Sequence, residues 1–461
     1  MSVPSSILDL IGNTPMLRLK SFDTGPCTLL LKLECQNPGG SIKDRIGRSM
    51  IEAAEREGKI NPGATLVEAT AGNTGLGLAL VAASKGYKLI LVIPDKMSGE
   101  KLSHLRALGA SIIMTRSDVG KGHPQYYQDL AERIASETVG AYYINQFNNP
   151  ANPLAHELTT GPEIWEQTEH KLDAVVCGVG SGGTITGLSR YFASVAPDVE
   201  IVLADPEGSV LAEYIRTKKI GTAGSWLVEG IGEDFIPAIA DLSRVKRAYS
   251  ISDAEAFTTV RALLKQEGVL AGSSTGTLLA AALRYCREQT QPKTVVTLAC
   301  DTGSKYLSKV YNDFWMADQG LGGRTSAGDL RDFISRPFRE GAVVAVNPND
   351  PLTVTYARMR LYDVSQLPVM EGDKLVGIVD EGDLLLAVRR SDSAFDRPVR
   401  EVMTANVRTI DHRASLDDLM AILDSGLVAV VSDADGFHGI ITRIDVLNSL
   451  RKEHRRKKDR T

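Results

Sequence analysis

The stretch TLVEATAGNTGLGLALVAASKGYKLILVIP, residues 65–94, places two short apolar runs on either side of a glycine-bearing turn and a helical segment. Residues 65–69 and 88–94 are rich in Val, Ile and Leu, as are strands that are covered on both faces of a parallel sheet. Residues 76–86 carry the apolar side chains of a helix that crosses from one strand to the next. The stretch therefore predicts a strand–helix–strand unit of an α/β fold.

The same alternation continues toward the C-terminus. A second helical stretch lies at 100–110, and further apolar runs follow at 111–115, 172–179, 201–205 and 293–300. We therefore expect open sheets of parallel type with helices on both faces, in one domain that spans residues 1–323. A segment containing Gly and Ser follows, and we interpret residues 324–333 as a linker.

The remainder contains an internal repeat. LPVMEGDKLVGIVDEGDLL from Leu367 matches VAVVSDADGFHGIITRIDVL from Val428, and the matching Gly377 and Gly439 are 62 residues apart (439 − 377). Each copy has a helical stretch, a strand, a polar turn, a second strand and a helix. The repeat predicts a tandem α+β module with units at 334–392 and 393–451, followed by a basic tail at 452–461 that we expect to be frayed and solvated.

Composition and charge exclude several classes of protein. The chain has 461 residues, of which 43% are hydrophobic, enough for two or three domains. Its net charge is −5 with both signs spread along the chain, so we expect neither nucleic acid nor a membrane as a partner. The five cysteines form no CxxC pair and the N-terminus has no leader pattern, so we expect reduced thiols, no metal and a cytoplasmic location.

One lysine stands in an unusual place, within NPGGSIKDRIG at residues 37–47. Ser41 and Asp44 fit a capping box, and the spacing that follows predicts a helix with Lys43 in its first turn. The positive end of the helix dipole disfavours an ammonium there, and burial would add to the effect. Both favour a neutral, reactive amine; an ordinary surface lysine is the alternative for this segment alone.

Two glycine-rich loops follow predicted strands. EATAGNTGLGLAL from Glu68 offers backbone N–H groups and an Asn amide at the carboxyl end of a strand, where ligands of open α/β sheets bind. VVCGVGSGGTITGL from Val175 repeats the arrangement and suits a phosphate. Its GxGxxG pattern, with Asp205 at the end of the next strand, also fits a dinucleotide fold, but that alternative gives Lys43 no role.

An amine, an amide-bearing loop and an anion-binding loop are together what a pyridoxal phosphate site requires. These residues resemble the β-family (fold type II) pyridoxal phosphate enzymes, which include cysteine synthases and cystathionine β-synthases. The resemblance runs from Ile7 to about Met316 through IGNTPMLRL, NPGGSIKDR, GNTGLGLAL, GSGGTITG and AGSSTGT, in that order. It implies a fold type II core, pyridoxal 5'-phosphate as cofactor, and a homodimer or higher homo-oligomer.

Three further features are similar to the cystathionine β-synthases within that family. They are VEGIGEDFIP from Val228, YNDFWM from Tyr311, and the repeats, which look like a pair of CBS domains (a Bateman module). The resemblance implies condensation of L-serine with L-homocysteine to cystathionine, with side reactions of cysteine that release hydrogen sulfide. The alternatives are a cysteine synthase that uses O-acetylserine and sulfide, and a CBS-domain sensor of adenosyl ligands with a degenerate enzyme half.

The resemblance also implies residue roles. Lys43 would form the Schiff base with the cofactor and move the α-proton of the substrate, Asn73 would hydrogen-bond the phenolic oxygen of the cofactor, and Ser274 would face its pyridine nitrogen. The phosphate would bind to Gly180, Ser181, Gly182, Gly183 and Thr184, and the substrate carboxylate to Thr70, Ala71, Gly72, Thr74 and Gln146.

The chain departs from the family pattern at a few positions. Ala71 stands where many members have serine, and Phe147 and Glu233 stand where the animal enzyme has tyrosines, so we expect substrate handling to differ in detail. The first motif begins close to the first residue of the sequence, so we expect neither the haem-binding extension of animal members nor a haem.

The second repeat carries a candidate regulatory site. TRID at residues 442–445 resembles the Thr-x-x-Asp with which CBS domains hold an adenosine ribose, whereas the first copy reads DEGD. The resemblance implies that Thr442 and Asp445 bind S-adenosylmethionine or an adenine nucleotide, and an aspartate suits a sulfonium better than a phosphate. The alternative is a module that is purely structural.

Overall fold

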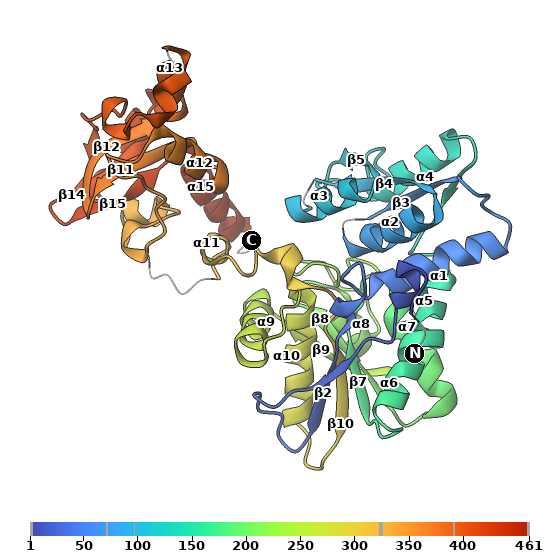
Figure 1. The fold of residues 1–461 in the computed structure, drawn as a ribbon. Coiled ribbons are helices and arrows are strands. Elements are labelled where there is room, and N and C mark those ends of the chain that lie inside the picture. Colours follow the sequence, from blue (N-terminus) through green and yellow to red (C-terminus); the bar gives the residue numbers. More distant parts are fainter. Residues whose placement is uncertain (1–2, 71, 96, 322–325, 391, 459–461) are drawn as a thin grey trace. The chain divides into compact units, whose positions relative to one another are not determined.

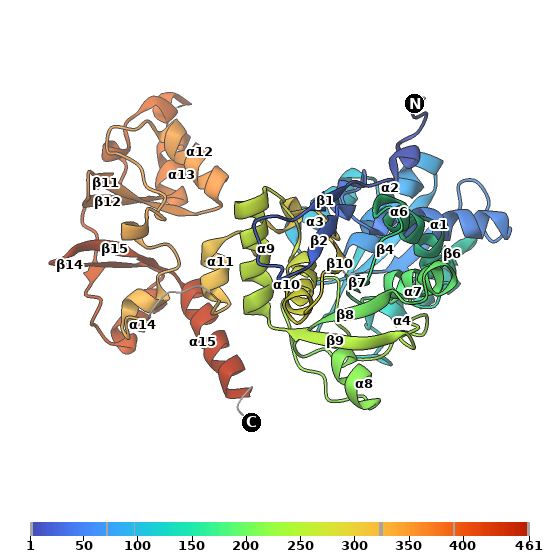
Figure 2. The ribbon, with the colours of Figure 1, turned by 90° about the horizontal axis from the view of Figure 1, so that it is seen from below.

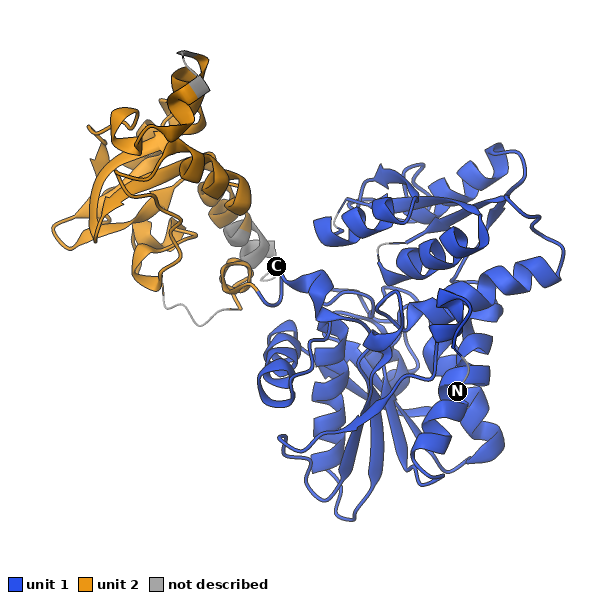
Figure 3. Ribbon diagram, viewed as in Figure 1, with its two compact units in different colours: residues 1–311 blue, residues 312–461 orange. Residues whose placement is uncertain are grey.

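The computed structural model describes residues 3–70, 72–95, 97–321, 326–390 and 392–458 (Figure 1). The chain divides into two compact units, residues 1–311 and residues 312–461 (Figure 3). Among the described residues, no helix combines the length and the apolar character that crossing a membrane requires.

The first unit is built on two sheets. In the larger sheet β1 pairs antiparallel with β2 at one edge, and the other neighbours pair in parallel. Its strand order is β1 (Met16–Arg18), β2 (Thr28–Lys32), β10 (Thr294–Leu298), β7 (Ala174–Cys177), β8 (Glu200–Pro206) and β9 (Val245–Ile251). The smaller sheet is parallel throughout, with the order β5 (Ser111–Thr115), β4 (Lys88–Pro94), β3 (Thr65–Ala69) and β6 (Ala141–Tyr143).

Helices lie on both sides of the larger sheet. The pair α9 (Asp253–Glu267) and α10 (Ser273–Arg287) covers one side, and α6 (Gly161–Gln167) and α7 (Gly183–Val195) lie on the other (Figure 1). Helix α8 (Leu211–Thr217) lies beside the edge strand β9 (Figure 2). The parallel strands are therefore shielded from water, as their near-continuous apolar sequences predict.

The smaller sheet is covered in the same way. One face packs against α2 (Asn73–Lys85) and α3 (Gly99–Ala107), and the other against α4 (Tyr127–Glu137). Helix α1 (Lys43–Arg56) packs on α2, and α5 (Ala151–Ala155) leads into α6 through one π-helical turn. The α/β prediction is confirmed, because the apolar runs at 65–69, 88–94 and 111–115 form the strands β3, β4 and β5.

The second unit contains the two repeats, and each has the predicted order of helix, strand, turn, strand and helix. The first copy consists of α12 (Leu352–Tyr362), β11 (Gln366–Glu371), β12 (Lys374–Asp380) and α13 (Glu381–Arg390). The second consists of α14 (Leu416–Asp424), β14 (Ala429–Asp433), β15 (Gly436–Ile441) and α15 (Arg443–Lys458), with β13 (Thr409–Ile410) parallel to β14. The unit begins with α11 (Asp313–Asp318).

The two copies share an irregularity and a core. The antiparallel pairs β11–β12 and β14–β15 both shift register, after Val369 and after Val431. Met370 of the first copy packs with Val430 and Phe437 of the second, so the copies bury apolar surface against each other. Units of this size bury their apolar faces poorly alone, so this shared core stabilises both copies.

The basic tail differs from the expectation. Helix α15 continues to Lys458, so residues 452–458 are helical rather than frayed, and the last three residues lie outside the described part.

Candidate active site

Loops from both sheets of the first unit meet at the carboxyl ends of their strands. Asn73, after β3, donates from Nδ2 to Oδ2 of Asp301, after β10, at 2.7 Å. Asn152, after β6, donates from Nδ2 to Oγ of Ser181, after β7, at 2.9 Å. Two side-chain hydrogen bonds therefore join the sheets at the edge where open α/β sheets bind ligands.

Lys43 lies in the first turn of α1, as predicted, and is half-buried. The segment before it is fixed to the end of the larger sheet, because Ile42 N donates to Cys300 O at 2.8 Å and Ser41 forms a β-bridge with Asp301. Desolvation lowers the pKa of Lys43, and the nearby Cys300, Asp301 and Glu233 oppose that shift. The result is a fixed amine that loses its proton more readily than a surface lysine.

The capping box expected at the start of this helix is wrong. Ile42 occupies the N-cap position with no side-chain cap, and Ser41 Oγ accepts a hydrogen bond from Lys43 N at 3.2 Å instead. Asp44 accepts from Gly39 N at 2.6 Å and so fixes the loop before the helix. Burial raises the pKa of Asp44 to about 7, against the opposing bond from Gly39.

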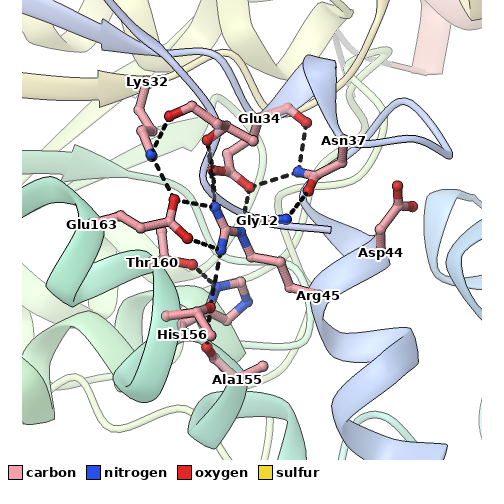
Figure 4. A network of polar contacts seen from close by, with 12 residues as sticks. Gly12, Lys32, Glu34, Asn37, Asp44, Arg45, Ala155, His156, Thr160 and Glu163 are labelled. Atoms are coloured by element: carbon pink, nitrogen blue, oxygen red, sulfur yellow. Dashed lines mark hydrogen bonds and ion pairs between the residues drawn. The ribbon is translucent and has the colours of Figure 1, made fainter. Parts of the chain in front are cut away.

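A buried charge network anchors α1 through Arg45, and Asp44 lies apart from it (Figure 4). Arg45 binds Glu34 in a two-pronged contact, with Nε and Nη2 each 2.7 Å from a carboxylate oxygen. It binds Glu163 in the same manner, again at 2.7 Å, and Glu163 also accepts from Lys32 at 2.7 Å. Because Arg45 is two residues from Lys43, this network sets the position of the lysine.

Two glycines let α1 and α2 approach closely. A Cβ atom on Gly77 would lie 2.5 Å from Lys43 O, and one on Gly47 would lie 2.7 Å from Gly77 C. No real Cβ tolerates such distances, so the glycines place the backbone of Lys43 directly against α2, the helix that begins at Asn73.

Asn73 is held from both ends of its amide. Its Oδ1 accepts from Lys305 Nζ at 2.9 Å, while its Nδ2 donates to Asp301. Lys305 also donates to Gly39 O at 3.0 Å, and Tyr306 donates to Asp301 at 2.7 Å. The amide orientation is thus determined by a cation on one side and a carboxylate on the other.

Gly180 to Thr184 form a narrow loop that leads into α7, which begins at Gly183. A Cβ on Gly183 would lie 1.8 Å from Asn152 Oδ1, and one on Gly180 would lie 2.6 Å from Gly230 O. Gly182 has φ +92°, which favours glycine. The first N–H groups of α7 have no intrahelical partner, so the loop suits one phosphate group.

Thr184 at the end of this loop is backed by a neutral histidine. His156 Nε2 lies 3.2 Å from Thr184 Oγ1, and His156 Nδ1 lies 3.0 Å from Thr160 Oγ1. Burial lowers the pKa of His156 well below its usual value, and the cations Lys43 and Arg45 add to the effect.

The predicted carboxylate loop is also brought together, apart from Ala71, which lies outside the described residues. Thr74 Oγ1 donates to Gln146 Oε1 at 2.7 Å, and Gly72 N donates to Thr70 Oγ1 at 3.1 Å. Beneath them Glu68 is fully buried, and burial raises its pKa to about 8. A carboxylic acid at that place adds little negative charge to repel an anionic ligand.

Ser274 lies in the first turn of α10 and is buried. Its hydroxyl is next to Cys300. Burial raises the pKa of the Cys300 thiol to about 12, and the hydrogen bond with Ser274 acts in the opposite direction. Ile42 N donates to Cys300 O, and Lys43 lies near the same cysteine, so Cys300 has both Ser274 and Lys43 as neighbours.

Sequence reasoning missed Asn152, Asp301 and Lys305. Asp301 directly follows a predicted strand, so the strand-end rule could have found it. Asn152 and Lys305 carry no sequence signal, since their partners Ser181 and Asn73 are far away along the chain.

The second unit contains a cleft of about 600 Å³ whose lining includes Thr442 and Asp445. Asp445 Oδ2 accepts from Thr442 N at 2.7 Å and from Thr442 Oγ1 at 2.5 Å, and Asp445 Oδ1 accepts from Ser335 Oγ. Arg336, Arg443 and Asp363 line the same cleft, so charges of both signs surround Asp445.

Comparison with protein families gives this geometry a context. Residues 7–301 match the family of pyridoxal-phosphate dependent enzymes, and residues 330–390 and 399–452 match the CBS domain. The chain belongs to the pyridoxal-phosphate-dependent enzymes, and its cofactor is pyridoxal phosphate.

Comparison with individual proteins shows which members of this family the chain is similar to. Cystathionine beta-synthase of Dictyostelium discoideum is 36% identical over 98% of this chain and 94% of its own length. Cysteine synthase A of Escherichia coli (strain K12) is 42% identical but covers only 65% of this chain and 92% of its own length. The crystal structure of O-acetylserine dependent cystathionine beta-synthase from Helicobacter pylori superposes with a TM-score of 0.63 at 36% identity, over 68% of this chain and 100% of that one. Within the family, the chain belongs with the cystathionine beta-synthases.

Proposed function

We propose that this chain condenses L-serine, or an activated serine, with L-homocysteine to form cystathionine in a β-replacement reaction. The observation that carries the proposal is the meeting of Lys43, Asn73 and the Gly180 loop where the carboxyl ends of the two sheets face each other, with the pKa of Lys43 lowered by desolvation. Bound to an amine, pyridoxal phosphate withdraws electrons from the α-carbon, which acidifies the α-proton and prepares the β-substituent to leave.

The loops provide binding and orientation. The N–H groups of Gly180 to Thr184 would bind the phosphate. Gly180, Gly182 and Gly183 have no room for a Cβ atom, which fits a loop that binds through its backbone. Asn73 would donate to the phenolic oxygen, since an amide nitrogen has two hydrogens and the Asp301 bond uses one of them.

The chain's side chains would also direct the chemistry. Lys43 in its neutral form would take the α-proton and later return it. Ser274 would face the pyridine nitrogen with a hydroxyl rather than a carboxylate, so no fixed negative charge keeps that nitrogen protonated. A weaker electron sink favours loss of a β-substituent over reactions such as transamination, which need a long-lived carbanion. Thr70, Gly72, Thr74 and Gln146 would bind the substrate carboxylate.

Replacing Asn73 by Ala should leave the cofactor bound, shift its visible absorption and slow turnover. One hydrogen bond to a charged oxygen is worth about 1.5–3 kcal/mol, which is a loss of roughly 10- to 100-fold in rate. Asn61→Ala, at an exposed loop position, is the control. An unchanged spectrum and rate in Asn73→Ala would place this residue outside the site.

The substrates are tested by crossing two donors with two nucleophiles. Purified protein is given L-serine or O-acetyl-L-serine with L-homocysteine or sulfide, and products are identified by mass spectrometry. We expect cystathionine with homocysteine. Cysteine from sulfide as the sole product would instead support cysteine synthase activity, which is the name of the Escherichia coli relative. No product in any combination would support the degenerate-enzyme alternative.

We propose further that the cleft at Asp445 binds an adenosyl compound, S-adenosylmethionine or an adenine nucleotide. Asp445 would accept hydrogen bonds from the ribose hydroxyls. For this, the hydrogen bond from Ser335 Oγ to Asp445 Oδ1 would have to break. The first copy is a poorer binding site. Asp380 N donates to the Asp383 carboxylate at 3.1 Å and Asp383 N donates to the Asp380 carboxylate at 2.8 Å, and neither residue lines the cleft.

Asp445→Asn should weaken adenosyl binding more than tenfold and leave basal turnover unchanged, because bonds from a charged oxygen to hydroxyls contribute about 1.5–3 kcal/mol each. Calorimetry on the full chain with S-adenosylmethionine, AMP and ATP measures the effect, and Asp383→Asn at the matching position of the first copy is the control. If none of the three ligands binds the wild type at millimolar concentration, the module is structural.

The proposal also covers the domain limits of the chain, its oligomeric state and its location in the cell. We retain a catalytic domain at 1–323, a linker at 324–333, CBS units at 334–392 and 393–451, and a basic end at 452–461, which the CBS-domain matches support in outline. We also retain a cytoplasmic homodimer, which light scattering at micromolar concentration would test; a monomer would contradict it.

A further inference from the structure

A cluster in the second repeat has no part in either site described above. His412 follows β13, Asp433 ends β14, and His438 lies on β15. One ligand atom from each, His412 Nδ1, Asp433 Oδ2 and His438 Nε2, lies within 4.8 Å of the other two. Asp433 Oδ2 accepts from His438 Nε2 at 2.9 Å and also from His412 Nδ1. All three side chains are more than nine-tenths buried.

The position of His438 shows that the fold does not require a histidine there. In the β14–β15 pair, Val431 faces Gly439 and Ser432 faces Phe437, so His438 is the extra residue of a β-bulge. The first copy has the same bulge, with Val369 facing Gly377 and Met370 facing Leu375, and its extra residue is Val376. Valine fills the place without polar contacts, and bulges commonly re-aim a side chain. The second copy therefore carries a buried imidazole that the shared architecture does not demand.

The three atoms have the chemistry and spacing of a metal site. Two imidazole nitrogens and one carboxylate oxygen are a ligand set that Zn²⁺ accepts. Tetrahedral ligands at bond lengths of about 2.0–2.1 Å lie roughly 3.3 Å apart, so the observed cluster needs only small side-chain movements to surround an ion.

The groups around the cluster fit as well. Asp329 Oδ2 lies 3.9 Å from His412 Nε2, so it would have to move closer to accept the proton that this nitrogen carries when Nδ1 binds a metal. Arg413 Nε now donates to His412 Nε2 at 3.2 Å and would have to withdraw, which its exposed position permits. Asp411 Oδ1 lies 3.7 Å from His412 Nδ1 and provides a further carboxylate oxygen beside the cluster.

We propose that His412, Asp433 and His438 bind a divalent transition-metal ion of the Zn²⁺ class and thereby join the three strands of the second repeat. The absence of a CxxC pair predicted no metal, whereas the ligands proposed here are two histidines and a carboxylate. The site is independent of the proposed β-replacement reaction, and its ligands come from one repeat.

The test uses the full-length, cofactor-loaded protein after treatment with a chelator. Titration with ZnCl₂ in a calorimeter and elemental analysis after gel filtration should give one zinc per chain, with a higher melting temperature of the second unit, since a ligand of the native state stabilises it. His438→Val, which installs the residue of the first copy, should weaken binding by more than about tenfold and leave turnover unchanged. His170→Val, at an exposed histidine of the first unit, is the matched control and should bind zinc like the wild type.

Asp433→Asn provides a second variant that keeps the shape of the site, in case His438→Val does not fold. It too should lose zinc. Zinc binding that is equal in the wild type and in the folded variants, or no binding by the wild type at micromolar zinc, would overturn the proposal and leave the cluster as a hydrogen-bonded strand clamp.

Discussion

Lys43→Ala is expected to abolish turnover while the protein stays folded. The lysine would both hold the cofactor covalently and transfer the α-proton, and proton transfer by a positioned group alone contributes about 10²–10⁴-fold. Its amine is prepared for both tasks by desolvation and by anchoring of the preceding segment to Cys300. The side chain makes few stabilising contacts, so the free energy of unfolding should change by no more than about 1 kcal/mol.

Steady-state formation of cystathionine or cysteine measures the effect, with circular dichroism to show that the fold is intact. Lys59→Ala is the matched control, because Lys59 is an exposed lysine with only a surface ion pair to Glu57. Activity of Lys43→Ala within about tenfold of the wild type would refute the catalytic assignment.

Arg45→Met is expected to have the largest effect on stability. Its removal would break the ion pair of the fully buried Glu34 and would deprive Glu163 of one of two cations. Breaking a buried pair in this way costs about 3–5 kcal/mol, because the remaining charge is neither hydrated nor paired. Since Arg45 also anchors the helix that carries Lys43, cofactor affinity should fall with stability.

Urea unfolding followed by hydrogen exchange of peptides from residues 1–311 measures this loss in the catalytic unit. Arg48→Met is the control on the same helix, because its pair with Glu52 is only partly buried and such pairs are worth about 0–1 kcal/mol. A loss below about 1 kcal/mol in Arg45→Met would mean that the network does not support α1.

The same network predicts a pH dependence. Burial opposes the shift, but Arg45 and Lys32 lower the pKa of Glu163 to about 2, from 4.5 in an unfolded chain. A group whose pKa falls on folding stabilises the native state above its unfolded pKa, and this stabilisation is lost as the pH falls from about 4.5 toward 2. Acid unfolding of Arg45→Met should therefore depend less steeply on pH in that window; an identical slope would contradict the pairing.

Local signals in the sequence were sufficient for the elements and for the centre of the site. The apolar runs became β3, β4 and β5, and Lys43 does lie in the first turn of its helix, because strand and helix periodicity depend on neighbours along the chain. The 62-residue repeat likewise predicted the order of helices and strands in both copies, but it did not predict their matching bulges.

Long-range partners could not be predicted in this way. Asp44 fits a capping box by spacing, yet it binds Gly39 because the turn before the helix brings that N–H closer. Glu163 is 118 positions from Arg45, and nothing near either residue marks them as a pair. The basic end was expected to fray because of its charge, whereas its helix continues from the apolar start of α15.

The most direct test is to find which lysine carries the cofactor. Purified holoenzyme is reduced with borohydride, which makes the bond between pyridoxal phosphate and its lysine permanent, then digested and analysed by mass spectrometry. We predict that the pyridoxyl group is on Lys43. A modified lysine elsewhere, or no modified lysine in protein that contains pyridoxal phosphate, would contradict the account.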